Sequence, residues 1–71
     1  MIDATQVGRR IASRRTLKGW TQGKLAEELD FSVPKVSAHE RGVRDMTIGQ
    51  LAAYAGALDV SPGYLLTGEA G

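Results

Sequence analysis

The chain has 71 residues, a net charge of +1 and no cysteine. This length bounds it to one domain, expected over residues 1–71, near the lower limit at which a hydrophobic core holds without cross-links. The lack of cysteine excludes disulfides and thiolate zinc sites. Apolar residues make up 42% of the chain and aromatic ones only 6%, which favours a compact helical domain over a β-sandwich.

Neither the start of the chain nor its apolar runs look like a targeting or membrane segment. The first residues, MIDATQVGRRIAS, contain no apolar signal core. The longest run of small and apolar residues, LAAYAGAL at 51–58, is too short to span a bilayer. We therefore expect a cytoplasmic protein with no membrane partner.

Positive charge is confined to the first part of the chain. All nine Lys and Arg lie between Arg9 and Arg44, and residues 1–45 also carry six Asp and Glu. Residues 46–71 carry two acids and no base. This asymmetry predicts an anionic partner for the first part of the chain; a merely solvated charged face is the plainer alternative.

One helix-start pattern occurs five times. In each copy a Ser, Thr or Asp can cap a helix, an apolar residue precedes it, and another apolar residue follows four positions after it. Five starts at this spacing leave no room for strands, so we expect an all-α fold, a compact five-helix bundle. The predicted caps are Asp3, Thr21, Ser32, Thr47 and Ser61.

The first helix is predicted over residues 4–17, with a capping box completed by Gln6 and with Lys18-Gly19 ending it. The second is predicted over residues 22–29. Asp30 then takes a left-handed turn position where Gly is more usual. The inward-facing residues of these two helices are Val7, Ile11, Leu25, Ala26 and Leu29.

The third helix is predicted over residues 33–40, with Gly42 as its stop. Pro34 falls at the second helical position, where the missing N–H is one that the helix leaves unpaired anyway. Because a proline biases the residue before it away from helical angles, we expect the helix to begin one residue after Val33.

The fourth helix is predicted over residues 48–58, with Gln50 completing a second capping box. Gly56 inside it costs about 1 kcal/mol relative to Ala, so we expect a close approach of another helix at that position. A short last helix begins at Pro62 and ends near Thr67-Gly68, followed by a tail at 67–71. The fourth helix offers Leu51, Tyr54, Ala55 and Leu58 to the core.

Helices two and three are joined only by Asp30, Phe31 and Ser32, which forces a sharp bend. This spacing predicts a helix-turn-helix unit over about 21–41, in which the second helix enters the DNA major groove. Basic residues surround the unit: Arg14, Arg15, Lys18, Lys24, Lys35, Arg41 and Arg44.

Four stretches carry a family resemblance that covers nearly the whole chain. The chain resembles the Cro/repressor-type helix-turn-helix family, also called the xenobiotic-response-element family, whose members are five-helix DNA-binding domains of bacterial and phage regulators. The stretches are VGRRIASRR at 7–15, GWTQGKLAEEL at 19–29, FSVPKVSAHERG at 31–42 and SPGYLLTG at 61–68.

The resemblance implies roles for individual positions. Gln22 corresponds to a residue that contacts a phosphate, and Arg41 and Arg44 correspond to residues that hold the DNA backbone. Arg15 and Glu40 correspond to an internal ion pair. The groove-facing positions of the third helix, with Lys35 on its flank, are Ser32, Val33, Pro34, Ser37 and Ala38.

Five positions depart from the family pattern. Arg14 stands where an apolar residue is usual, so it either extends past the core or contacts a phosphate. His39 also replaces an apolar residue and is expected to be a partly buried packing residue rather than a DNA contact or pH sensor. Trp20 is expected to pack on the core, and Asp45-Met46 leaves the loop before the fourth helix undefined.

The chemistry of the third helix predicts how DNA is read. Discrimination between bases needs bidentate donors or acceptors, which Val33, Pro34 and Ala38 lack. These side chains can press on thymine methyl groups, while Ser37 and Lys35 can each make one hydrogen bond. We therefore expect T-containing steps in the site, a strong contribution of DNA shape, and salt-sensitive affinity from phosphate contacts.

These observations predict a sequence-specific transcriptional regulator that binds double-stranded operator DNA at the nucleoid, most simply a repressor of phage or mobile-element type. Two alternatives are an antitoxin that binds its own promoter and a toxin, and a protein-interaction module that has lost DNA binding. One histidine and no cysteine give no catalytic pair, metal cluster or cofactor site, so an enzyme is not expected.

The resemblance also implies a homodimer, because two-fold operators match two-fold proteins. The expected surface is the C-terminal region with Tyr64, Leu65 and Leu66, of which one or two face the core. A separate C-terminal domain in a longer parent protein is compatible with the sequence.

Overall fold

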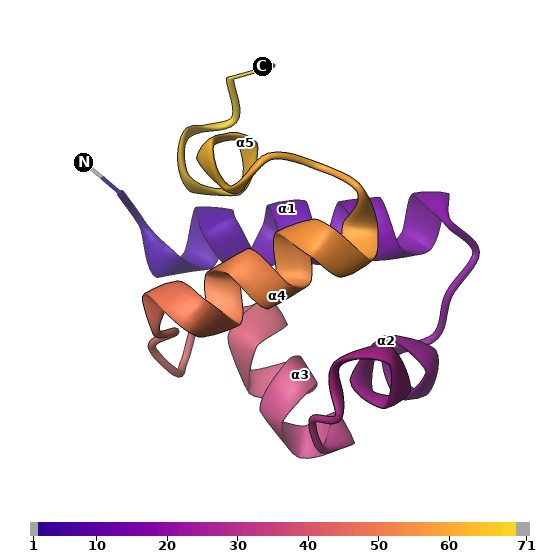
Figure 1. The fold of residues 1–71 in the computed structure, drawn as a ribbon. Helices are drawn as coiled ribbons and strands as arrows, with labels where there is room; N and C mark the ends of the chain where they lie inside the picture. The colour runs from indigo at the N-terminus through magenta and orange to yellow at the C-terminus, as the bar shows by residue number, and fades with distance from the viewer. Residues whose placement is uncertain (1, 70–71) are drawn as a thin grey trace.

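The computed structural model describes residues 2–69, which form five helices and no strand. Figure 1 shows α1 and α4 crossing the middle of the molecule, with α5 on one side of them and α2 and α3 on the other. The expected all-α, five-helix architecture is confirmed. Residues 70 and 71 of the predicted tail lie outside the described residues. The helices are α1 (Ala4–Leu17), α2 (Gln22–Leu29), α3 (Val33–Arg41), α4 (Ile48–Leu58) and α5 (Pro62–Thr67).

Short polar side chains begin all five helices, as the sequence pattern predicts. Each cap residue has an extended backbone, and its side-chain oxygen accepts a hydrogen bond from an N–H of the first turn. The capping box with Gln50 is present. The box predicted with Gln6 is wrong: the Asp3 carboxylate accepts from the Thr5 N–H at 2.9 Å, one position earlier than a box requires.

The start of α3 matches the predicted range of 33–40, the one-residue delay expected from Pro34 is wrong, and the helix ends one residue later than predicted. The helix begins at Val33, not one residue later, because Ser32 takes the extended cap conformation and accepts from the Lys35 N–H at 3.2 Å. Pro34 is therefore accommodated within the first turn. The helix continues through Arg41, one residue further than expected, and Gly42 closes it in the left-handed conformation.

The core is apolar and receives side chains from every helix. The inward positions expected from the sequence are buried, except that Leu29 is half-buried and packs on the core edge together with Trp20, Phe31 and Met46. Tyr54 is the largest fully buried side chain. The core residues are Val7, Ile11, Leu25, Ala26, Val36, Leu51, Tyr54, Ala55, Leu58 and Leu65.

A close approach of two helices occurs at Gly8, not at Gly56 as expected. A methyl group at Gly56 would meet no atom within 4 Å, so that prediction is wrong. A methyl group at Gly8 would overlap the backbone carbonyl oxygens of His39 and Glu40. Because these are backbone atoms, α1 and α3 can lie this close only where a side chain is missing.

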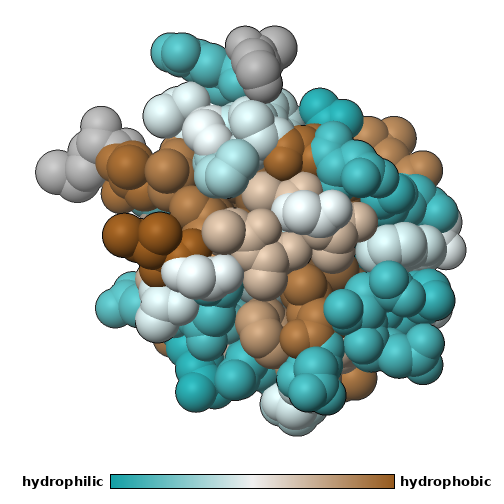
Figure 2. Space-filling model, viewed as in Figure 1, coloured by the Kyte–Doolittle hydropathy of each residue, from teal (hydrophilic) through white to brown (hydrophobic). Residues whose placement is uncertain are grey.

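The surface of α4 that faces the viewer in Figure 1 is open. In Figure 2 the middle of this face is white, tan and in places brown, the colours of residues of intermediate to high hydropathy, with hydrophilic residues around much of it. Gly56 and Ala52 of α4 are exposed. Within residues 2–69, no helix is both long and apolar enough to cross a membrane.

Candidate nucleic-acid interface

The turn between α2 and α3 holds the two helices at a fixed angle. Asp30 adopts the left-handed conformation at φ 57°, as the sequence predicts for this position. The Phe31 N–H then donates to the Ala26 carbonyl at 2.9 Å, and Ser32 caps α3. Three residues thus redirect the chain and present the first turn of α3 to solvent.

The predicted groove-facing residues lie on the exposed part of this turn and helix. Ser32, Val33 and Pro34 are exposed, whereas Ser37 and Ala38 are half-buried. Val36, between them in sequence, is fully buried and anchors the helix to the core. The first turn of α3 is therefore accessible and carries the apolar Val33 and Pro34, while Ser37 and Ala38 are partly accessible in the next turn.

Cations without acidic partners collect along α3 and the residues after it. Lys18 pairs with Asp59 at 2.9 Å, and Lys24 pairs with Glu28 at 2.9 Å. Arg15 pairs with Glu40. Among residues 2–69, the other basic residues around the helix-turn-helix unit form no ion pair. These residues are Lys35, Arg41 and Arg44, with Arg14 considered below.

Two of these cations are held by nearby side chains. The Lys35 ammonium lies 5.0 Å from the centre of the Phe31 ring, and the Arg41 Nε donates to the Ser37 hydroxyl at 3.4 Å. Arg44 is exposed in the loop after α3. Positive charge thus lies near the start of α3, at Lys35, and at its end, at Arg41 and Arg44, and among residues 2–69 no carboxylate is paired with these three cations.

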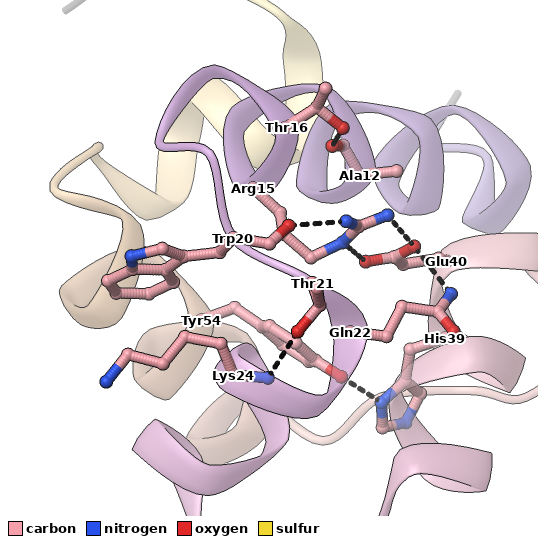
Figure 3. A network of polar contacts seen from close by, with 10 residues as sticks. All are labelled: Ala12, Arg15, Thr16, Trp20, Thr21, Gln22, Lys24, His39, Glu40 and Tyr54. Atoms are coloured by element: carbon pink, nitrogen blue, oxygen red, sulfur yellow. Dashed lines mark hydrogen bonds and ion pairs between the residues drawn. The ribbon is translucent and has the colours of Figure 1, made fainter.

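Arg15 and Glu40 lie in contact, in the arrangement implied for them. Arg15 Nε donates to Glu40 Oε2 at 2.6 Å and Nη2 donates to Oε1 at 3.1 Å. The hydrogen bond to Glu40 raises the pKa of Arg15 above its ordinary value. A further donor, Arg15 Nη1, reaches the Trp20 carbonyl at 2.8 Å, so one guanidinium links α1, α3 and the residue before the α2 cap (Figure 3).

Gln22, the expected phosphate contact, belongs to the same network. Its Nε2 donates to Glu40 Oε1 at 3.0 Å. In Figure 3 the amide comes from the start of α2 and points toward the carboxylate on α3. This link was not foreseen from the sequence, because Gln22 and Glu40 are 18 positions apart and only the tertiary fold brings them together.

His39 is a packing residue, as expected, but it is fully rather than partly buried. Its side chain is fully buried between Phe31 and Tyr54, and its Nδ1 lies 2.7 Å from the Tyr54 hydroxyl. Nε2 is buried without a hydrogen-bond partner among the described residues. Burial lowers the pKa of His39, the backbone of Asp45 opposes this shift, and the charges of Arg44 and Lys35 add to it. Burial also raises the pKa of Tyr54.

The remaining departures from the family pattern have structural roles. The Arg14 guanidinium lies 4.5 Å from the centre of the Tyr64 ring, which matches the expectation that it extends past the core. Trp20 is half-buried on the core edge, with the ammonium groups of Lys18 and Lys24 at 4.9 and 5.8 Å from its ring. Met46 packs on the core, while Asp45 is exposed.

Arg10 is a structural residue that the sequence did not single out. Its Nη1 donates to the carbonyls of Leu65 and Leu66, both at 3.1 Å, and so satisfies the end of α5. Within residues 2–69, no group of His, Asp and Glu side chains is arranged to hold a metal ion.

Known proteins share this fold and much of its sequence pattern. The family model described as Helix-turn-helix matches residues 11–65. An HTH-type transcriptional regulator of Rickettsia conorii, RC0668, is 31% identical over 62 residues, which cover 87% of this chain and 50% of the relative. The chain spans about half the length of the curated relatives it matches.

Two solved structures are similar over nearly their whole length. The restriction-modification controller protein C.AhdI from Aeromonas hydrophila is 32% identical with a TM-score of 0.84, covering 89% of this chain and 96% of that one. The P22 c2 repressor protein, in complex with a synthetic operator, is 33% identical with a TM-score of 0.83 and the same coverage.

Proposed function

The chain belongs to the helix-turn-helix family, and from this membership we propose that it binds double-stranded DNA as a transcriptional regulator of the repressor type. The observation that carries the proposal is the accessible surface of α3, whose first turn is exposed and which is flanked by Lys35, Arg41 and Arg44, none paired with an acid among the described residues. Unpaired cations around a protruding helix suit a phosphate backbone on either side of a groove.

The contacts divide into backbone and base contacts. Arg41, Arg44 and the amide of Gln22 hold phosphates, which gives affinity without sequence information. Val33, Pro34 and Ala38 press on thymine methyl groups, while Ser37 and Lys35 each make one hydrogen bond to a base edge. Sequence preference therefore depends on T-containing steps and on the deformability of the duplex.

Selection of bound duplexes from a random pool, scored at two salt concentrations, tests this function. We expect an enriched motif with T-rich positions and an affinity that falls steeply with salt. Combined Lys35→Ala and Arg41→Ala substitutions abolish binding while the fold persists. Lys18→Ala is the control for the loss of a cation, because its ammonium is paired with Asp59, the residue after α4. A chain that binds no duplex even at low ionic strength contradicts the proposal.

We further propose that two copies bind a two-fold operator through the C-terminal region. Leu65 is buried and the Tyr64 ring lies under Arg14, so Leu66 is the residue of that region left for contact. Leu66 lines an open groove of about 560 Å³ beside Ile48, which is 88% exposed. An exposed isoleucine beside an apolar groove suits a self-complementary contact.

Sedimentation with and without the selected operator tests this assembly. We expect two copies of the wild-type chain per operator, and only one copy per operator at the same concentration for the variant that combines Ile48→Ser with Leu66→Ser. A single copy on a motif without two-fold symmetry would contradict the dimer and leave the DNA-binding proposal standing.

A further inference from the structure

The Glu40 carboxylate is the centre of the polar network in Figure 3. It accepts two hydrogen bonds from Arg15 and one from the Gln22 amide, at 2.6 to 3.1 Å. Its side chain is only 6% exposed. An ion pair between Glu40 and Arg15 of α1 requires no contact with α2. The hydrogen bond to Gln22 is therefore not explained by the ion pair.

A bond to a charged acceptor fixes a side-chain amide in one of two orientations. An amide has one acceptor and two N–H donors, and a carboxylate can accept only from the N–H end. Charge-assisted bonds are roughly twice as strong as neutral ones. Glu40 thus holds Nε2 of Gln22 inward with one N–H, and leaves that nitrogen a second N–H.

Gln22 also stands where a helix attracts anions. It is the first residue of α2, and the Thr21 hydroxyl satisfies the N–H of Lys24. The backbone N–H groups of Gln22 and Gly23 precede that capped position and have no acceptor within the helix. Backbone donors at a helix start favour a phosphate, and an amide that shows an N–H beside them adds to the same site.

We propose that Glu40 is a positioning residue for DNA binding: through its hydrogen bond it holds the Gln22 amide so that the second N–H donates to a phosphate at the start of α2. Arg15 neutralises the carboxylate, so the phosphate meets no net negative charge there. This inference rests on the proposed function, and it gives the ion pair a part in DNA affinity as well as in the fold.

A double-mutant cycle separates this role from a purely structural one. Gln22→Ala lowers affinity about fivefold on both selected and random duplexes, the loss of one hydrogen bond. Glu40→Gln lowers it about threefold in the wild-type background and by less than about 1.5-fold in the Gln22→Ala background. If the two losses multiply, Glu40 acts independently of Gln22 and the inference is overturned.

The sign and the salt dependence of these losses are further readouts. Removing a negative charge near DNA would by itself raise affinity, so a loss with Glu40→Gln opposes the general electrostatic effect. Both variants keep the wild-type salt slope, because a neutral amide displaces no counterion, whereas Arg41→Ala lowers the slope by about 1. Unchanged or higher affinity of folded Glu40→Gln would overturn the inference.

The amide resonances of the wild-type chain test the geometry without any substitution. We expect the Gln22 side-chain N–H signals to be shifted and slow to exchange in the free protein, and one of them to shift again when a duplex binds. Gln50 is the internal control, since its amide oxygen accepts from Thr47 in a capping box. Exchange and shifts for Gln22 like those of a solvated amide, or no response to DNA, would overturn the inference.

The same data distinguish the failure of this inference from that of the proposed function. If the wild-type chain binds no duplex, the proposed function fails and the inference falls with it. If the chain binds DNA and the double-mutant cycle shows no coupling between Gln22 and Glu40, only the positioning role of Glu40 is rejected.

Discussion

Gly8 of α1 and Gly56 of α4 occupy the interiors of two neighbouring helices, but their surroundings differ completely. A methyl group at Gly8 would overlap two backbone carbonyl oxygens of α3, whereas one at Gly56 would meet nothing within 4 Å. Each glycine costs its helix about 1 kcal/mol relative to alanine. Only at Gly8 does the fold gain something in return, the close contact between α1 and the helix proposed to enter the groove.

The difference shows that the two sides of the molecule are specified by different means. The α1–α3 junction relies on the backbone contact at Gly8 and on the partly buried ion pair of Arg15 and Glu40, and the buried bond of His39 to Tyr54 also ties α3 to the inner side of α4. The outer face of α4 is open and carries small side chains. Substitutions should therefore have large effects where α3 contacts α1 and the inner side of α4, and small effects on the outer face of α4.

Gly8→Ala is expected to have the largest effect. The added methyl group meets backbone atoms of α3, which cannot move without displacing the helix, so unfolding free energy should fall by about 2–3 kcal/mol. A domain of this size has roughly 4–10 kcal/mol in total. Urea denaturation followed by circular dichroism measures the loss. If Gly8→Ala is as stable as the wild type, α1 and α3 can move apart at no cost, and the two glycines do not differ in this respect.

Breaking the buried bond between His39 and Tyr54 should have the next largest effect. Tyr54→Phe leaves His39 Nδ1 buried without a partner and should cost about 1–2 kcal/mol. Combining it with His39→Leu removes both polar groups, so the double variant should lose about 1 kcal/mol less than the sum of the single losses. Additive losses in the same denaturation experiment would mean that the two groups do not interact.

Acidification should weaken the contact of α3 with α4 through His39. Because the pKa of His39 is lowered from 6.5 in the fold, the unfolded chain binds a proton that the folded chain does not. This contribution to stability is complete above pH 6.5 and is lost below it, at up to about 1.4 kcal/mol per pH unit. Denaturation curves from pH 7.5 to 5.5 measure the loss, which His39→Leu should reduce. If stability falls equally with pH in the wild type and in His39→Leu, the loss comes from titratable groups other than His39.

Gly56→Ala should have the smallest effect, and of opposite sign. With open space around the position and ordinary helical geometry, the substitution should stabilise the chain by about 0.5–1 kcal/mol. It is also the matched control for Gly8→Ala, since the chemical change is identical. A loss of stability would mean that the space around Gly56 is not open to a methyl group.

Local signals in the sequence predicted the helices well. Each cap is a short polar side chain that bonds to its own first turn, so the helix starts depend on neighbouring residues only. The left-handed turn at Asp30 and the inward faces of the helices follow from equally local rules. The predicted capping box at Gln6 failed because Asp3 bonds to Thr5, a choice between two adjacent donors that the sequence does not decide.

Contacts between distant segments were predicted poorly. Which glycine permits a close approach depends on how two helices cross, and the sequence pattern favoured Gly56 over Gly8. The bonds of Arg10 to the end of α5, and of Gln22 to Glu40, join residues many positions apart. The expected DNA-contact residues rest on family resemblance, and the structure adds which cations near them are already paired.

Trp20 has a consequence for how this molecule can be studied. It is the only tryptophan in the chain, and its carbonyl accepts the Arg15 hydrogen bond that ties α1 to the start of α2. Its half-buried ring lies near two ammonium groups, so its emission is sensitive to small displacements of that segment. The protein thus carries an intrinsic fluorophore beside the Arg15–Glu40–Gln22 network, and changes there can be followed optically without attaching a dye.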